Sequence, residues 1–430
     1  LDAPLQRTAL AALRQQLAEL SGRNVEDGAI VVLDNATGAV LAWVGSSGAF
    51  SDAPQVDGVL ARRQPGSTLK PFVYGLAIEQ KLITPATLLD DSPTQLATAG
   101  GLYRPQNYDQ AYQGWVSVRT ALGSSLNIPA VRVGAMLGPD ALFERLNAFG
   151  LALPESGSYY GHALALGGAD VTLLALTNAY RGLANGGVLG PVVTQSGAAG
   201  RPAPVSGEAR RVAPGPGAAG PRRVADAAAT YLVGHMLADN NARAGTFGLN
   251  SQLATRGFAA AKTGTSKDLR DNWCIGYTGR YTVGVWVGNA SGAPMHDVSG
   301  VSGAAPIWRQ LVLQLHAGQP SRAPLAPAGV VQARVAFEGG REPPRDEVFL
   351  AGTAQPLQRT GSLGGAQARG FGIDNPRDGS LYALDPDIPP KAQRITFSGQ
   401  AGTWWLDGKA IGQGSQVAWA PWPGRHELKL

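Results

Sequence analysis

The stretch Arg63-Gln64-Pro65-Gly66-Ser67-Thr68-Leu69-Lys70 is the starting point for interpreting this sequence. It holds the chain's single Ser-x-x-Lys pattern, in a segment over 67–80 that we expect to be helical. Residues three apart share a helix face, so the Lys70 amine can reach the Ser67 hydroxyl. A serine near a helix N-terminus also lies at the positive end of the helix dipole, which favours an alkoxide. Taken alone, the pattern nevertheless favours a simpler interpretation, a helix-capping serine followed by an exposed lysine.

Two further short motifs follow along the chain. Ser125-Leu126-Asn127 begins 58 residues after Ser67, and Lys262-Thr263-Gly264-Thr265 begins 137 residues after Ser125. Alone, the first is typical of a turn and the second of a polar loop or an edge strand. All three in this order are far more specific, because Ser-x-x-Lys, Ser-Asp-Asn and Lys-Thr-Gly together mark penicillin-binding proteins and class A β-lactamases.

The chain therefore resembles the penicillin-binding, serine D,D-transpeptidase family over residues 25–318. Leu126 stands where the family motif has Asp, at a side chain that need not face the substrate. Asp271-Asn272-Trp273, after the third motif, is also similar to the family. Glu342-Pro343-Pro344-Arg345 and the stretch 382–387 resemble the C-terminal region of the class A, 1C subgroup. Members of that subgroup are bifunctional, with a glycosyltransferase domain and a membrane anchor, and we find neither here.

The resemblance implies a catalytic role for five side chains. Ser67 would attack the carbonyl of the penultimate D-Ala of a peptidoglycan stem peptide. Lys70 would act as its base, made neutral by burial and by the nearby charge of Lys262. Ser125 would relay a proton to the leaving D-Ala amine, and Asn127 would hold Lys70 and the substrate amide.

The resemblance also implies how the substrate is held. Lys262, Thr263 and Thr265 would bind its terminal carboxylate. Gly264, which has no side chain to clash, would allow the acyl chain to approach closely. The backbone N–H groups of Ser67 and Thr265 would form the oxyanion hole.

The implied activity is peptidoglycan cross-linking at the periplasmic face of the bacterial inner membrane, in a membrane-anchored parent protein. The acyl-enzyme would be attacked by an amine of a second stem peptide, and β-lactams would mimic D-Ala-D-Ala and trap the serine. Other cell-wall synthesis proteins are expected partners. Two alternatives stay open: a hydrolase of the same fold (a D,D-carboxypeptidase or a β-lactamase), and a non-catalytic β-lactam-binding sensor or wall scaffold. Glu144 and Glu155 lie between the second and third motifs, but neither begins a Glu-x-x-x-Asn element of the kind β-lactamases use for deacylation.

Composition disfavours several other functions. The 430 residues carry a net charge of +5 and only 16% charged residues, and they lack a basic run with interleaved aromatics, so we expect no nucleic-acid partner. The single cysteine, Cys274, excludes an intrachain disulfide, and we expect it to be a buried strand residue. The five His residues are dispersed, which argues against a His-based metal site and leaves carboxylate sites open. We expect no metal in the active site and no cofactor. No run of about 18 apolar residues is present, so we expect no membrane span within the chain.

The expected fold is α+β, an antiparallel sheet packed between helices as in penicillin-binding transpeptidases and serine β-lactamases, followed by an all-β, immunoglobulin-like C-terminal domain. A hairpin is predicted at 29–44, two paired strands at 274–288, and helices at 171–184, 224–239 and 305–316. Four of the nine Trp lie in the tail, where we favour a β-sandwich core over a glycan-binding surface. The expected domains are a helix from a missing upstream domain at 1–24, the transpeptidase domain at 25–318, a linker at 319–345 and a β domain at 346–430, with 196–223 a loop or insertion.

Overall fold

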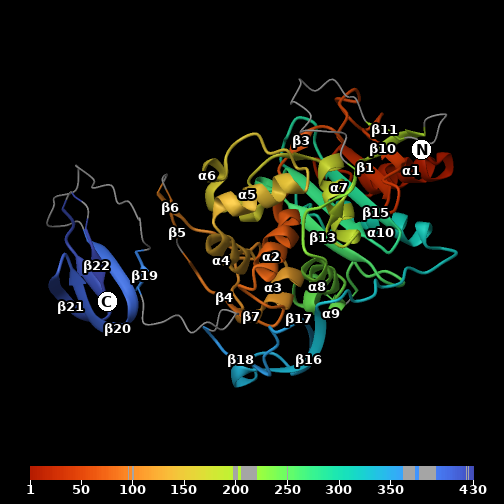
Figure 1. Ribbon diagram of the computed structural model, residues 1–430. Coiled ribbons are helices and arrows are strands. Elements are labelled where there is room, and N and C mark those ends of the chain that lie inside the picture. The colour runs from red at the N-terminus through yellow and green to blue at the C-terminus, as the bar shows by residue number, and fades with distance from the viewer. Residues whose placement is uncertain are drawn as a thin grey trace. The chain divides into compact units, whose positions relative to one another are not determined.

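The computed structural model describes residues 1–94, 96–98, 101–196, 202–204, 220–248, 250–361, 373–376, 394–422, 424 and 426–430. Most of the expected insertion at 196–223 and all of the stretch 382–387 lie outside these residues. The chain forms two compact units, Leu1–Gly365 and Ala366–Leu430 (Figure 1). No helix in the described part of the chain combines the length and the apolar character that a bilayer crossing needs.

Unit 1 is organised around a five-stranded sheet. Its order is β13 (Ala260–Thr265), β14 (Asp271–Tyr277), β15 (Tyr281–Gly288), β1 (Asp27–Asp34) and β2 (Val40–Val44). Every neighbouring pair is antiparallel. All seven residues of β14 are buried, so both faces of the sheet are covered, and the third motif lies on the edge strand β13.

Helices cover the sheet on both faces. On one face, α1 (Ala3–Glu19) and α10 (Ala304–Leu315) bury an apolar cluster that includes Leu13, Leu17 and Trp308. On the other face, α7 (Leu173–Ala184) and α8 (Ala227–Leu237) belong to a larger cluster that also contains Trp273 and Trp286 of the sheet. This three-layer arrangement, visible in Figure 1, confirms the predicted antiparallel sheet between helices.

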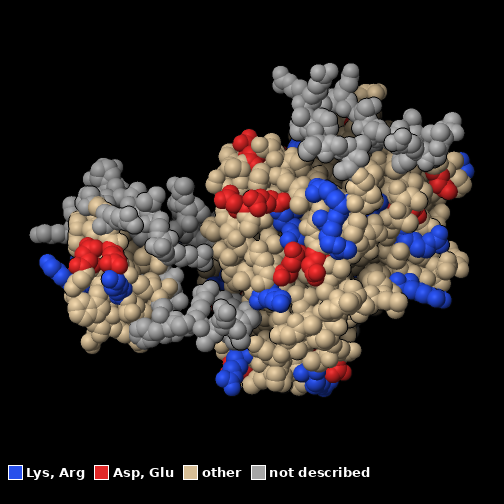
Figure 2. Space-filling view, in the orientation of Figure 1, with Lys and Arg blue, Asp and Glu red and all other residues tan. Residues whose placement is uncertain are grey.

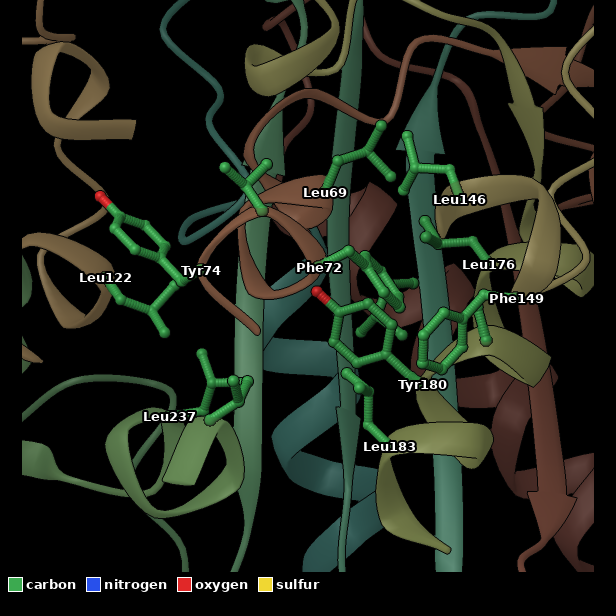
Figure 3. Close-up of a cluster of buried hydrophobic side chains, with 14 of the residues drawn as sticks. Leu69, Phe72, Tyr74, Leu122, Leu146, Phe149, Leu176, Tyr180, Leu183 and Leu237 are labelled. Atoms are coloured by element: carbon green, nitrogen blue, oxygen red, sulfur yellow. The ribbon is translucent and has the colours of Figure 1, made fainter. Parts of the chain in front are cut away.

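The larger cluster fixes the helix that follows the serine motif. The Phe72 ring lies 4.9 Å from Phe149 and 5.6 Å from Tyr180 between centroids, both in edge-on geometry (Figure 3). The Tyr180 hydroxyl donates a hydrogen bond to the Thr68 carbonyl at 2.7 Å, next to Ser67. The core therefore reaches directly to the backbone that carries the serine.

Unit 1 contains further helices and short strands. They are β3 (Arg62–Arg63), η1 (Gly66–Leu69), α2 (Lys70–Glu79), β4 (Leu88–Asp91), β5 (Leu96–Thr98), β6 (Gly101–Tyr103), β7 (Gly114–Ser117), α3 (Val118–Gly123), α4 (Asn127–Leu137), α5 (Pro139–Ala148), α6 (Gly157–Tyr160), η2 (Gly161–Leu166), β8 (Val171–Thr172), β9 (Val188–Leu189), β10 (Val193–Ser196), β11 (Pro202–Pro204), β12 (Arg222–Arg223), α9 (Asn240–Phe247) and η3 (Lys267–Leu269). On the face drawn in Figure 2, the charged side chains of the described residues are scattered among uncharged ones and form no continuous basic or acidic surface.

The structure differs from the expected domain division between 319 and 365. Residues expected to be a linker form β16 (Val330–Phe337), η4 (Glu338–Gly340) and the start of β17 (Arg345–Leu350), and β18 (Leu357–Gln358) pairs with β16. Their apolar side chains pack into unit 1: Val335, Phe337 and Phe349 cluster with Ala86 and Leu88. Unit 1 therefore extends to Gly365 rather than ending before 319. The expectation of a linker was wrong because a segment rich in Pro and Gly can still form strands that bury apolar side chains.

The described part of unit 2 is all β, as predicted. One sheet holds β19 (Ile373–Asn375), β20 (Ile395–Leu406), β21 (Lys409–Trp419) and β22 (Leu428–Lys429). The tight turn at Asp407-Gly408 joins β20 to β21 as expected, with both residues at positive φ. Trp404 is buried in the small core, whereas Trp405 and Trp422 are exposed. The described strands form a single sheet, so the second sheet of a sandwich stays a prediction.

Candidate active site

The serine motif begins on a tightly packed turn. Ser67 lies in η1, directly before α2, and Gly66 has φ +54°. A Cβ on Gly66 would lie 2.5 Å from the Thr265 carbonyl oxygen, and a Cβ on Gly264 would lie 2.3 Å from the Pro65 carbonyl oxygen. The two glycines therefore allow the serine turn and the third motif to approach backbone to backbone. Packing therefore requires a glycine at position 264, in addition to the expected role of Gly264 in letting an acyl chain approach.

The second motif lies between two helices in a strained conformation. Ser125 has φ +60°, which is uncommon for a residue with a side chain, and Asn127 is the first residue of α4. Such strain costs of order 1–3 kcal/mol and persists only when the surroundings hold it, which is typical of functional sites. Lysine side chains hold both the carbonyl and the hydroxyl of Ser125.

Hydrogen bonds bring all three motifs together. The Lys70 amine donates to the Ser125 carbonyl and to Asn127 Oδ1, each at 2.6 Å. The Lys262 amine donates to Ser125 Oγ at 2.7 Å and to the Thr263 carbonyl at 2.9 Å. Lys70 Nζ also lies 3.5 Å from Ser125 Oγ. Ser125 is therefore the meeting point of two lysines that lie 192 residues apart in the chain.

Both lysine amines are pushed toward the neutral form. Lys70 is fully buried, and burial, followed by the charge of Lys262, holds its pKa well below 10.5. Burial, followed by the charge of Arg243, lowers the pKa of Lys262 to about 7. Desolvation disfavours the ammonium form of a buried lysine, so both amines lose a proton more readily than an exposed lysine does.

The Ser67 hydroxyl is not hydrogen-bonded to Lys70, its expected base. Among the described residues, Ser67 Oγ makes no hydrogen bond, and the side chain is partly exposed. A neutral lysine amine has two N–H donors and one lone pair, and the two short bonds of Lys70 use both donors. The lone pair is left to accept a hydroxyl proton. Catalytic hydrogen bonds are often long or absent before substrate binds, so this geometry is compatible with a base role.

The expected carboxylate-binding residues line the edge strand. Thr263 and Thr265 alternate with Gly264 on β13, so their side chains share one face of the sheet. The Thr265 hydroxyl oxygen accepts a hydrogen bond from Gly300 N at 3.0 Å, which leaves its proton free to be donated to an anion. By the same alternation Lys262 lies on the opposite face, where it contacts Ser125, so the edge strand offers two hydroxyls on one face and one cation on the other.

Sequence analysis missed a second group of residues behind Asn127. Asn107 Oδ1 accepts from the backbone N–H of Asn127 at 2.8 Å, and Asn107 Nδ2 donates to both carboxylate oxygens of Asp91 at 2.9 Å. The Asn127 side-chain amide donates to the Gln106 carbonyl at 2.7 Å. Asp91 and Asn107 are both buried, a state that their polar character does not predict. The only signal in the sequence was their position between the first two motifs.

Two residues near the third motif lie outside the proposed chemistry. Cys274 is fully buried on β14, and burial raises the pKa of its thiol far above the usual range, so its expected status as a buried strand residue is confirmed. Lys267 is exposed in η3 and lies outside the hydrogen-bonded cluster of described side chains.

Comparisons with known families match two regions. A family model described as the penicillin binding protein transpeptidase domain matches residues 28–311. A second model, the penicillin-binding protein C-terminus family, matches residues 362–430. The second match begins close to the division between the two compact units.

Curated relatives are longer than this chain. Penicillin-binding protein 1C of Escherichia coli K12 is 33% identical over 353 residues, which cover 81% of this chain and 42% of that protein. Penicillin-binding protein 1A of Neisseria lactamica is 32% identical over 321 residues, which cover 71% of this chain and 38% of that protein. The chain thus spans less than half the length of these relatives.

Solved structures share the fold. Penicillin-binding protein 1A from Haemophilus influenzae superposes with a TM-score of 0.63 at 25% identity, over 76% of this chain and 53% of that one. The PonA1 protein from Mycobacterium tuberculosis, in complex with penicillin V, gives a TM-score of 0.58 at 24% identity, over 76% of this chain and 86% of that one. At that identity the second likeness concerns the fold alone.

Proposed function

Because this chain belongs to the penicillin-binding protein transpeptidase family, as the order of its three motifs predicted, we propose that it cross-links peptidoglycan stem peptides through an acyl-enzyme on Ser67. The observation that carries the proposal is the convergence of two buried, low-pKa lysines on one strained serine beside the Ser67 turn. That arrangement offers a base, a proton relay and an anion-binding edge within one site.

Acylation proceeds through Lys70. The neutral amine takes the Ser67 hydroxyl proton while the oxygen attacks the carbonyl carbon of the penultimate D-Ala. The backbone N–H groups of Ser67 and Thr265 stabilise the oxyanion, and loss of one such donor typically costs about 10²–10³ in rate. As the C–N bond breaks, the leaving D-Ala nitrogen takes a proton from Ser125 Oγ, which recovers one from Lys70 at 3.5 Å.

Substrate binding depends on Lys262 remaining charged. In its protonated form it attracts the terminal carboxylate, together with the hydroxyls of Thr263 and Thr265. Asn127 holds the Lys70 amine and receives the substrate amide. An amine of a second stem peptide then attacks the ester carbonyl, its proton passes to Lys70, and the Ser67 hydroxyl is restored. β-Lactams acylate the same serine.

The proposed setting is the periplasm, with stem peptides and β-lactams as ligands and other wall-synthesis proteins as partners. The relatives that carry this proposal are bacterial penicillin-binding proteins by name.

Product analysis tests the activity. The protein is incubated with a thioester analogue of the donor peptide, with and without a D-amino acid acceptor, beside Ser67→Ala and the exposed-serine control Ser21→Ala. The proposal predicts an acceptor-dependent transfer product from the wild type and from Ser21→Ala, and none from Ser67→Ala. Hydrolysis that is indifferent to the acceptor would identify a carboxypeptidase instead. Release of one equivalent without turnover would identify a sensor.

A further inference from the structure

We propose that β16 and β17, which follow the segment matched by the transpeptidase family model, hold the Ser125–Asn127 motif in its working position, with Glu347 as the positioning residue that acts through Arg119. This inference rests on the proposed acylation of Ser67. It extends the functional unit beyond residue 311, into a stretch that sequence analysis expected to be a linker.

The first observation is a buried ion pair between β17 and α3. The Glu347 side chain is fully buried, and its two oxygens accept hydrogen bonds from Arg119 Nη2 and from Arg119 Nε, the latter at 2.8 Å. Burial alone would raise the pKa of Glu347, but the hydrogen bonds and charges of Arg119 and Arg345 hold it below the ordinary value. A buried charge that loses its partner is strongly unfavourable, so this pair fixes the distance between β17 and α3.

A second set of contacts holds the start of the same helix. Glu342 Oε1 accepts from the Ser117 backbone N–H at 2.7 Å, and Arg345 bridges Glu342 Oε2 at 2.6 Å and the Ser117 hydroxyl at 3.1 Å. Ser117 is the N-cap of α3, since its hydroxyl oxygen accepts from Thr120 N. Arg345 and Glu347 of β17 thus bind α3 at its N-cap, Ser117, and two residues later, at Arg119.

α3 leads straight into the second motif. The helix runs over six residues, Val118–Gly123, which at 1.5 Å per residue is about 9 Å. It is followed by Ser124, whose hydroxyl donates to the Ala242 carbonyl at 3.0 Å, and then by Ser125. A shift of α3 therefore moves the serine that both lysines contact.

Arg119 also contacts the N-cap residue of α9. It pairs with Asp239 at 3.1 Å, and Asp239 caps α9 through the backbone N–H groups of Asn241 and Ala242. The Arg119 guanidinium thus helps to position two helices. One is α3, which Ser124 follows, and the other is α9, which contains Ala242, the acceptor of the Ser124 hydrogen bond.

A second route runs through β4. Val335, Phe337 and Phe349 of the strand pair pack on Ala86 and Leu88 at the start of that strand. β4 ends at Asp91, which Asn107 links to the backbone of Asn127. Both routes from β16 and β17 end on the second motif, and β17 lies beside α8 (Figure 1).

The test compares two substitutions on adjacent residues of β17 in the full chain. Glu347→Gln removes the buried charge, while Asp346→Asn removes an exposed one whose partner Arg334 lies 3.5 Å away. The rate of Ser67 acylation by a fluorescent penicillin is measured from pH 5 to 9, at a temperature where circular dichroism shows both variants folded. A displacement of about 1 Å can cost about 100-fold, so we expect Glu347→Gln to slow acylation about 10–100-fold and Asp346→Asn to stay within about twofold.

The pH profile separates positioning from stability. A shifted Ser125 would leave the Lys70 amine more hydrated, so the rising part of the profile, which follows loss of the Lys70 proton, should move to higher pH in Glu347→Gln. The separate decline at higher pH, which follows loss of the Lys262 charge, should stay in place. A Glu347 that only stabilises the fold would lower the melting temperature and leave the rate and profile of the folded protein unchanged, which would overturn the proposal. If Glu347→Gln does not fold, Glu342→Ala decides: about threefold to tenfold slower acylation supports the proposal and a wild-type rate overturns it. An unacylated wild type would instead refute the function proposed for Ser67.

Discussion

Asn107 offers the sharpest test of how the second motif is supported. Its amide donates to both oxygens of Asp91 at 2.9 Å and to the Ala111 carbonyl at 2.8 Å, and its carbonyl accepts from Asn127 N at 2.8 Å. Asn107→Asp keeps the size of the side chain and the acceptor for Asn127. It replaces the donor with an oxygen that faces the Asp91 carboxylate.

The expected magnitude follows from the distance between the two carboxylates. Two like charges about 4 Å apart repel by about 4 kcal/mol at an effective dielectric constant of about 20. The introduced carboxyl group can escape this cost by keeping a proton, so its pKa in the folded variant is raised above the unfolded value of about 3.9. A raised folded pKa stabilises below that pKa and loses the stabilisation as pH rises through it. We therefore expect a loss of about 2–4 kcal/mol at pH 8 and a smaller loss at pH 5.

The assay is urea unfolding of wild type and variant at both pH values, together with the ratio of their acylation rates. Asn250→Asp, at an exposed asparagine, controls for the added charge. Acylation should fall about tenfold relative to wild type at pH 8 and recover in part at pH 5. An equal loss of stability at both pH values, or a wild-type acylation rate at pH 8, would refute the reasoning.

Two further predictions concern the third motif. Acylation by a carboxylate-bearing β-lactam should weaken as pH rises through about 7, because Lys262 loses the charge that attracts the carboxylate. Lys262→Arg, which stays protonated, should abolish that decline. A wild type whose acylation rate does not change from pH 6 to 9 would contradict this prediction. Gly264→Ala should slow acylation at least about 100-fold and destabilise by about 1–3 kcal/mol, since its Cβ would lie 2.3 Å from the Pro65 carbonyl oxygen. The control Gly75→Ala meets only ordinary contact inside α2 and should stabilise by about 0.5–1 kcal/mol, so equal melting temperatures for the two variants would be evidence against the packing argument.

Sequence patterns predicted the parts of the fold that depend on local chemistry. The hairpin around Asp34–Gly38 and the β14–β15 pair were visible as apolar runs and turns. For Lys262 the pattern left a polar loop and an edge strand open, and the structure has the edge strand. The three motifs also come together in one site. Their order along the chain could predict this, because proteins that share such an order share a fold.

What the sequence could not reveal depends on burial and distance. Glu347 and Asp91 are acidic residues that an isolated sequence places at the surface, yet partners far along the chain hold both in the interior. The Pro- and Gly-rich stretch 319–345 was predicted to be a linker, but Val335 and Phe337 find apolar partners near Leu88. Long-range pairing of this kind leaves no periodic trace.

The most direct test of Ser67 as the nucleophile is the intact mass of the protein after incubation with benzylpenicillin, measured beside Ser67→Ala. The proposed mechanism predicts a long-lived adduct of one penicillin on the wild type and an unchanged mass for the variant. An adduct that persists in Ser67→Ala, or a wild type that stays unmodified while the antibiotic remains intact in solution, would contradict it.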